Sequence, residues 1–103
     1  MTEYNKLVRD LIPTILTVDG KNFSSYIASD EEYERKLKEK LLEEVNEFIE
    51  NPCLEELADI QQVLDTILYN MGHDNGVLNK KMFEKAVLRG TFSKKIILEK
   101  VEG

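Results

Sequence analysis

Apolar residues recur every three or four positions between residues 30 and 50, the spacing of one face of an amphipathic α-helix. Ser29 followed by Glu32 matches a capping box, which marks the start of a helix. Asn51-Pro52 marks the other end, because a proline has no backbone N–H with which to continue the helix. The pattern therefore predicts a helix over about residues 30–50.

The same spacing returns over residues 53–71, which predicts a second long helix. Gly72 follows it and is expected to stop it, as glycines commonly do after the last helical turn. The polar stretch HDNG (73–76) is expected to be a loop. A third, shorter helix is then predicted over 77–90, with Gly90 at its end.

The two flanks of the chain have weaker patterns. A short helix is expected to open near Pro13, within RDLIPTILTV. The stretches KNFSSYI (21–27) and KKIILEKV (94–101) are rich in β-favouring residues, and we expect them to pair as two short strands. The fold class predicted is mainly all-α: a small helical bundle with a minor two-stranded β element, completed by oligomerisation.

Composition limits the class of protein. With 103 residues, 42% of them apolar and 33% charged, residues 1–103 are expected to form a single domain. A net charge of −6 argues against binding to a nucleic acid polymer or an anionic membrane. Cys53 is the only cysteine, so no disulfide forms within one chain. No apolar run is long enough to span a membrane, and a cytoplasmic protein is expected.

The directions of the carboxylates follow from helix geometry, because an α-helix turns by about 100° per residue. In the helix predicted over 30–50, Glu44 falls inside the apolar arc and Glu47 falls on its shoulder. Glu43 and Glu50 fall outside that arc. One carboxylate of this helix is therefore expected to point inward, with a second one beside it.

The helix predicted over 53–71 repeats this asymmetry. Glu56 falls inside its apolar arc and Asp59 at the edge, whereas Glu55 falls outside. If the two helices pack antiparallel across the Asn-Pro turn, four carboxylates converge, namely Glu44, Glu47, Glu56 and Asp59. The alternative is that the acidic residues form a solvated face or pair with lysines.

Convergent carboxylates favour a bound cation. Two carboxylates about 5 Å apart repel each other by roughly 3 kcal/mol at an effective dielectric constant near 20. Several such pairs would consume much of the roughly 5–15 kcal/mol by which a domain is stable. A donor set made only of oxygen atoms suits Mg²⁺ or Mn²⁺ better than zinc.

Four stretches together resemble a known family. They are EEVNE (43–47), ELAD (56–59), YNKLVRDLIP (4–13) and KAVLRGTFSKKIIL (85–98). The first two match the EExxE and ExxD signature of the MazG-like superfamily of all-α nucleoside triphosphate pyrophosphohydrolases. The other two resemble its phosphoribosyl-ATP pyrophosphohydrolase-like house-cleaning branch. The resemblance covers nearly the whole chain, in the expected order.

This resemblance implies a reaction, a metal and an assembly. Family members cleave nucleoside triphosphates between the α and β phosphates, giving a monophosphate and pyrophosphate, with Mg²⁺ held by the signature carboxylates. The corresponding ligands here would be Glu44, Glu47, Glu56 and Asp59, with Glu47 or Glu44 orienting or deprotonating the attacking water. Related folds form homodimers or homotetramers, so a homo-oligomer is expected.

Five basic residues are candidates for phosphate binding, because Arg and Lys are the side chains that grip phosphate oxygens. They are Lys6, Arg9, Lys40, Lys85 and Arg89. The alternative is that they are solvated or pair with the acidic helices.

The sequence thus predicts a Mg²⁺-dependent nucleotide pyrophosphohydrolase that removes non-standard or surplus nucleotides. Two other functions remain open at this point. One is a related hydrolase that acts on another diphosphate-bearing metabolite. The other is a helical interaction domain that retains the fold without the chemistry.

Overall fold

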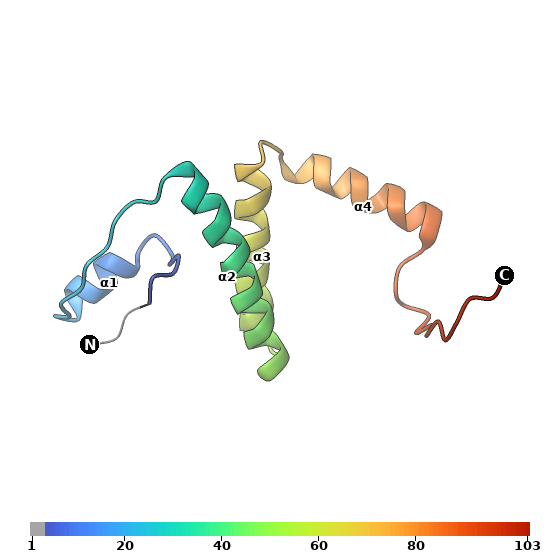
Figure 1. Cartoon of the computed structure of the whole chain (residues 1–103), viewed down its shortest axis with the longest axis horizontal. Coiled ribbons are helices and arrows are strands. Elements are labelled where there is room, and N and C mark those ends of the chain that lie inside the picture. The colour runs from blue at the N-terminus through green and yellow to red at the C-terminus, as the bar shows by residue number, and fades with distance from the viewer. Residues whose placement is uncertain (1–3) are drawn as a thin grey trace.

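The computed structural model describes residues 4–103 and folds them into helices joined by coil (Figure 1). The helices are α1 (Ile12–Val18), α2 (Asp30–Glu50), α3 (Leu54–Asn70) and α4 (Asn75–Arg89). The mainly α-helical fold class predicted from the sequence is therefore confirmed. Within the described range, no helix combines the length and the apolar character that crossing a membrane requires.

The two long helices begin and end where local signals place them. α2 begins after Ser29, whose hydroxyl accepts a hydrogen bond from the backbone N–H of Glu32 at 3.2 Å. Its last residue is Glu50, and Asn51, directly before the proline, is its C-cap. Beyond α3, Gly72 has a φ of 86°, in the left-handed region that glycine adopts without strain. The predicted bounds of both helices are confirmed to within one residue.

The start of α4 differs from the prediction. The carboxylate of Asp74 accepts a hydrogen bond from the backbone N–H of Val77 at 3.0 Å and so caps the helix. Asn75 and Gly76 consequently lie in the first turn of α4. The prediction of a loop over 73–76 is therefore wrong for residues 75 and 76, which are helical because Asp74 acts as the N-cap.

The predicted pair of strands is also wrong, since residues 4–103 contain no strand. Segment 21–27 lies beside α1, whereas segment 94–101 follows α4 at the opposite end of the molecule (Figure 1). β-Favouring side chains stabilise a strand only when they can pack on the half-buried surface of a sheet. Neither segment has a neighbouring strand with which to form such a sheet.

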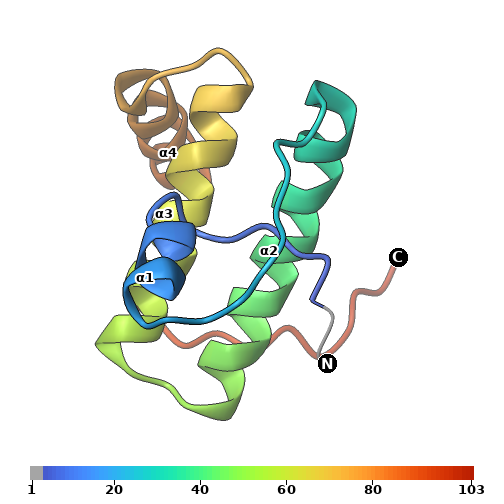
Figure 2. The ribbon, with the colours of Figure 1, turned by 90° about the vertical axis from the view of Figure 1, so that its left-hand side faces the viewer.

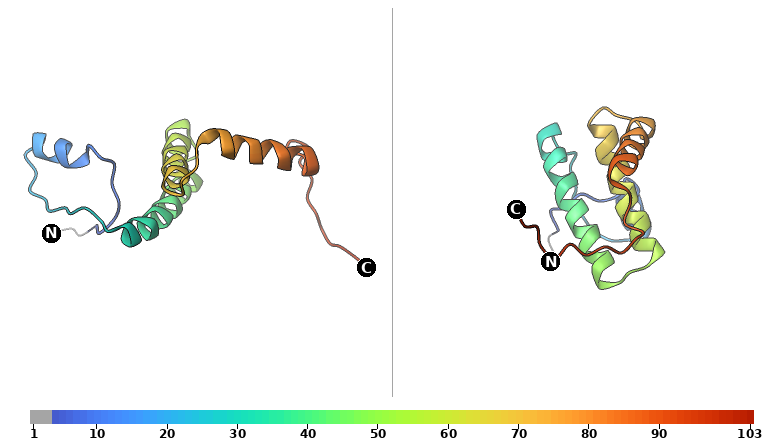
Figure 3. Two further views of the ribbon diagram at one scale, coloured as in Figure 1. Left: turned by 90° about the horizontal axis from the view of Figure 1, so that it is seen from above. Right: turned by 90° about the vertical axis from the view of Figure 1, so that its right-hand side faces the viewer.

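α2 and α3 lie side by side and antiparallel, and we call this pair the hairpin (Figure 2). α1 and α4 project from opposite sides of it (Figure 3). Across the described residues, Leu37 of α2 and Val63 of α3 are the only buried apolar side chains. The molecule therefore has a narrow core inside the hairpin and measures 61 × 31 × 27 Å overall.

Candidate metal centre

Carboxylates from both helices of the hairpin meet near the turn that joins them. Oxygen atoms of Glu44, Glu56 and Asp59 all lie within 4.8 Å of one another. Oxygen atoms of Glu43, Glu44 and Glu47 form a second set with the same spacing. Glu44 belongs to both sets, so the five residues form one acidic cluster. The cluster contains the four carboxylates that the sequence predicted to converge, together with Glu43.

Glu44 lies at the centre of the acidic cluster and is buried, with 6% of its surface exposed. The inward direction predicted for it from the helix wheel is therefore confirmed. Its Oε2 atom and the Oε2 atom of Glu56 are enclosed and have no hydrogen-bond partner within residues 4–103. A buried carboxylate oxygen without a partner is costly, because it has lost its water without replacement. A cation between the two helices would remove that cost.

Lys40 compensates only part of this negative charge. Its Nζ lies 3.3 Å from Oε1 of Glu44 and 3.2 Å from Oε2 of Glu43. Burial raises the pKa of the Glu44 carboxyl above its ordinary value of 4.5, and hydrogen bonding with Glu47 adds to that shift. The Lys40 ammonium opposes the shift in the pKa of Glu44 without cancelling it. Room for further positive charge therefore remains beside Glu44.

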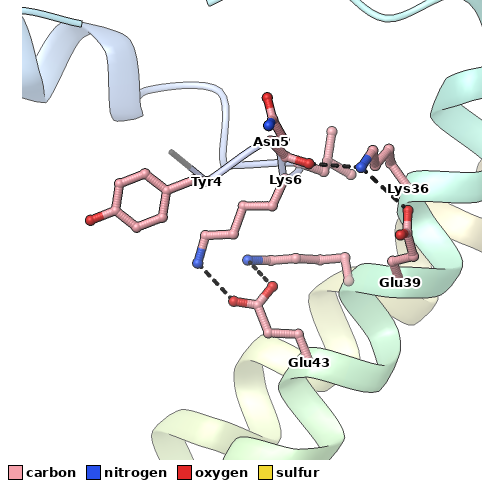
Figure 4. A pocket seen from close by; sticks show the side chains of 8 residues that line it. Tyr4, Asn5, Lys6, Lys36, Glu39 and Glu43 are labelled. Atoms are coloured by element: carbon pink, nitrogen blue, oxygen red, sulfur yellow. Dashed lines mark hydrogen bonds and ion pairs between the residues drawn. The ribbon is translucent and has the colours of Figure 1, made fainter. Parts of the chain in front are cut away.

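The N-terminal segment supplies two more cations. Nζ of Lys6 donates a hydrogen bond to Oε1 of Glu43 at 2.8 Å (Figure 4). The guanidinium of Arg9 donates to Oδ1 of Asp59 at 2.6 Å. Both residues were predicted to bind phosphate, with ion pairs to the acidic helices as the alternative. Both form those ion pairs, and this places both cations at the edge of the acidic cluster.

A pocket of about 160 Å³ lies between the N-terminal segment and α2 (Figure 4). It is lined by Tyr4, Asn5, Lys6, Leu7, Lys36, Glu39, Lys40 and Glu43. Lys36 ties the two walls together, because its ammonium donates to the carbonyl of Asn5 at 2.7 Å. Pockets that enclose drug-sized ligands have volumes of roughly 300–1,000 Å³. One chain therefore offers a polar recess beside the acidic cluster that is too small to enclose a whole nucleotide.

The other two predicted phosphate-binding residues lie elsewhere. Lys85 and Arg89 are on α4, which within the described residues contacts no helix except the adjacent α3. α4 leads away from the hairpin (Figure 1). A single chain therefore does not bring these two side chains to the acidic cluster.

The role of Glu43 was not predicted from the sequence. The helix wheel placed it outside the apolar arc, yet its side chain is only 28% exposed and binds two lysines. The position of Lys40, three residues earlier on the same helix, could have indicated its ion pair with Glu43. Lys6 was not such a signal, because it lies 37 residues away in the sequence.

The chemistry of the donor set fits a hard divalent cation. All five members of the acidic cluster offer carboxylate oxygens, which Mg²⁺ and Mn²⁺ prefer. Acidic clusters on protein surfaces are common, but this one contains two enclosed oxygens that have no partner in the described chain. In comparisons with known proteins, no family model, no curated protein and no solved structure matches the chain.

Proposed function

We propose that this protein is a Mg²⁺-dependent nucleoside triphosphate pyrophosphohydrolase of the cytoplasm. It hydrolyses the bond between the α and β phosphates and releases a nucleoside monophosphate and pyrophosphate. The observation that carries the proposal is the buried Glu44, which joins two sets of carboxylates and has an unpartnered oxygen. The order of the EEVNE and ELAD stretches, which resemble the MazG-like signature, supports it further.

Residues from both helices would hold the cation. Glu44, Glu56 and Asp59 provide one set of oxygens that bridges α2 and α3. Glu47 extends the site along α2 through its spacing to Glu44. A divalent cation held there, Mg²⁺ or Mn²⁺, supplies neutralisation of the polyphosphate charge and a lowered pKa for a bound water.

Glu47 is better placed than Glu44 to take a proton. It is exposed, so a water molecule can reach its carboxylate. Glu44 is buried and its Oε1 is already paired with Lys40. A general base must lie within hydrogen-bonding reach of the proton that it accepts. We therefore assign orientation and deprotonation of the attacking water to Glu47, and assign metal binding to Glu44.

Three cations at the edge of the acidic cluster are suited to the phosphates. Lys6, Arg9 and Lys40 each pair with a carboxylate of the cluster. A phosphate oxygen can replace a carboxylate oxygen in such a pair without loss of hydrogen-bond geometry. Arg9 offers two parallel donors, whereas Lys6 and Lys40 act as point charges.

The test is pyrophosphate release from a panel of standard and modified nucleoside triphosphates, with and without Mg²⁺. The wild type is compared with Glu56→Gln, and Glu55→Gln serves as the matched control. Glu55 is exposed and adjacent in the same turn of α3. We expect Mg²⁺-dependent turnover, a loss of about a hundredfold or more in Glu56→Gln, and less than about a twofold change in the control.

Four results would contradict the proposal. Turnover without a divalent cation, or an equal loss in both variants, would remove the metal centre from the mechanism. Turnover restricted to phosphoribosyl or sugar-linked diphosphates would favour a hydrolase of another diphosphate-bearing metabolite. A folded chain that binds no Mg²⁺ and turns over nothing would favour the interaction domain.

A further inference from the structure

Residues 5–9, which we call the strap, bury little apolar surface. Leu7 is half-buried and Val8 is exposed. The helix that follows, α1, contacts no other helix within the described residues. Figure 1 shows α1 apart from the hairpin. Hydrophobic packing therefore holds this part of the chain only weakly, and polar contacts decide where the strap lies.

One end of the strap is held by a contact that does not involve the acidic cluster. The ammonium of Lys36 on α2 donates to the carbonyl of Asn5 at 2.7 Å (Figure 4). Asn5 has a φ of 45°, in the left-handed region that asparagine adopts more readily than most residues. Lys36 has its own carboxylate partner, Glu39, which lies outside the cluster. This end of the strap is therefore independent of what binds at the cluster.

The other end of the strap is held by two members of the acidic cluster. Lys6 donates to Oε1 of Glu43 at 2.8 Å, and Arg9 donates to Oδ1 of Asp59 at 2.6 Å. Both carboxylates also belong to the sets of oxygens that fit a divalent cation. A cation held there draws on the same negative charge as the strap, and its own charge repels the two side chains.

We propose that the strap and a divalent cation compete for the acidic cluster, with Asn5 as the hinge. A cation at the cluster loosens Lys6 and Arg9 from their carboxylates, while Lys36 keeps the strap attached. The competition is reciprocal, because the strap must weaken cation binding by the same factor by which the cation loosens the strap. The inference rests on the metal site of the proposed function but not on its reaction.

The competition also gives the two side chains of the strap a second use. Once loosened, Lys6 and Arg9 remain beside the cluster, because the strap is still attached at Asn5. They then have donors to offer to phosphate oxygens. Cation binding thus prepares the strap for the phosphates of a substrate, so the metal is expected to bind before the nucleotide.

A supporting role for Arg9 would have the opposite consequence. Side chains that hydrogen-bond to a metal ligand commonly orient it, and their loss weakens metal binding by about 10- to 100-fold. Such orientation depends on a side chain that packing holds in place. The side chains of Arg9 and Asp59 are 56% and 37% exposed, and the strap has little packing of its own. Competition therefore fits this pair better than support.

The first test is the affinity for Mg²⁺, measured by titration calorimetry at constant ionic strength. Arg9→Gln should bind Mg²⁺ about fivefold more tightly than the wild type, because the competing cation is gone. Lys38→Gln is the charge-matched control. Lys38 lies on α2 and pairs with Glu34, outside the cluster, so its loss should change the affinity by less than about twofold. An affinity that is unchanged or weaker in Arg9→Gln would overturn the inference.

The second test separates the strap from the charge of Arg9 alone. Lys36→Gln removes the attachment at Asn5 and lowers the effective concentration of Arg9 at the cluster. It should tighten Mg²⁺ binding, although Lys36 contacts no member of the cluster. Arg9→Gln should then gain less when it is combined with Lys36→Gln than when it is made alone. Fully additive effects would mean that the strap does not act as a unit, and would overturn the inference.

The third test uses the wild type and so does not depend on the folding of a variant. Trypsin cleaves after lysine and arginine, and its rate follows the fraction of time for which a segment is open. Saturating Mg²⁺ should speed cleavage after Lys6 and Arg9 by about fivefold relative to cleavage after Lys21, which lies in exposed coil beyond α1. Sodium chloride at the same ionic strength gives the baseline.

The outcomes distinguish the strap from the metal centre. If calorimetry shows bound Mg²⁺ but the cleavage ratio stays the same or falls, the inference is overturned and the metal centre remains. If calorimetry shows no binding of Mg²⁺, the inference and the proposed metal centre are overturned together. None of the three tests measures catalysis, so an inactive protein can still confirm the competition.

Discussion

The hairpin buries a carboxylate, whereas residues 75–103, which we call the C-terminal arm, expose apolar side chains. Glu44 is 6% exposed inside α2, while Leu88 on α4 is 82% exposed. A stable monomer has the opposite distribution in both places, because burial favours apolar groups and penalises charge. The two regions therefore lack different things. Within residues 4–103, the acidic cluster of the hairpin has five carboxylates but only three paired cations, and the apolar side chains of the arm have no surface against which to pack.

The two regions also differ in what defines their local structure. The hairpin has a defined turn, a capped first helix and its own small core of Leu37 and Val63. The C-terminal arm has a capped helix but no buried side chain. A helix of that length owes most of its stability in water to the packing of its apolar face. We conclude that the hairpin can form within one chain and that the arm becomes stable on assembly.

The largest effect is expected from the narrow core of the hairpin. Leu37→Ala should lower the free energy of unfolding by about 2–5 kcal/mol, because it leaves a cavity between α2 and α3. Leu88→Ala removes a side chain that a lone chain exposes, so in a monomer it should change stability very little. In the homodimer that the family resemblance implies it should destabilise, and more strongly at low protein concentration. Urea unfolding of both variants at two protein concentrations measures these effects. A Leu88→Ala curve identical to that of the wild type at both concentrations would show that Leu88 does not pack against a second chain.

The next effect concerns the charge buried in the hairpin. Glu44→Gln should lower activity and Mg²⁺ affinity by about a hundredfold, roughly 2.7 kcal/mol, since it replaces the one carboxylate that belongs to both sets with a neutral amide. Without metal the same variant should be at least as stable as wild type, because it removes a poorly compensated buried charge. Titration calorimetry with Mg²⁺ and thermal unfolding with and without the metal measure both. Glu50→Gln, exposed on the same helix, is the control. A loss of stability in metal-free Glu44→Gln would indicate a structural role instead.

The predicted role of Arg89 in phosphate binding requires the site of a second chain, because a single chain does not bring α4 to the acidic cluster. Complementation between two inactive variants tests this role and joins the two regions in one measurement. Glu56→Gln damages the hairpin and Arg89→Gln damages the C-terminal arm, so each homodimer should be nearly inactive. Refolded together, they form hybrids in which one site combines an intact hairpin with an intact arm. Equal mixing should then restore about a quarter of the wild-type rate, because half of the dimers are hybrids with one good site in two. If the rate of the mixture equals the mean rate of the two separate variants, Arg89 does not contribute to the site of a second chain.

Local structure was predictable because its causes are local. The bounds of α2 follow from Ser29, the apolar repeat and the Asn-Pro pair, all within the helix or next to it. The inward direction of Glu44 follows from the same repeat. The expected strands failed because pairing needs two distant segments to meet, and a propensity for β structure does not bring them together. The predicted start of α4 is wrong because aspartate is common both in loops and at N-caps, and here Asp74 is the N-cap.

The surroundings of the acidic cluster were less predictable for the same reason. Lys6 and Arg9 reach it from the N-terminal segment, 37 and 50 residues away from their partners. A helix wheel describes one helix at a time, so it placed Glu43 on an outer face without the segment that crosses that face. A helix wheel also could not predict the exposure of the C-terminal arm. A helix that is apolar on all sides is expected to be buried, but the wheel does not show which element covers it.

The smallest effect is the pH dependence of the contact that holds the N-terminal segment on the hairpin. Burial alone would raise the pKa of Glu43, but hydrogen bonds from Lys6 and Lys40 outweigh it and lower that pKa below 4.5. The hydrogen bond to Glu43 raises the pKa of Lys6 above 10.5. The contribution of Glu43 is therefore complete above pH 4.5 and lost as pH falls through its lowered pKa. That of Lys6 is complete below pH 10.5 and lost as pH rises through its raised pKa.

The pair is partly exposed, so we expect it to contribute less than about 1 kcal/mol between those limits. Protection of the amides of residues 5–8 from hydrogen exchange, taken relative to the intrinsic rate at each pH, should be greatest on the plateau between them and should fall on both sides. Lys6→Gln should accelerate exchange on the plateau and flatten its pH profile after correction for intrinsic rates, whereas Lys21→Gln should leave it unchanged. A flat wild-type profile would mean that the segment is held by its other contacts, from Lys36 to the carbonyl of Asn5 and from Arg9 to Asp59. Arg9 would then be the cation that controls access to the acidic cluster, because its ion pair with Asp59 does not depend on Glu43.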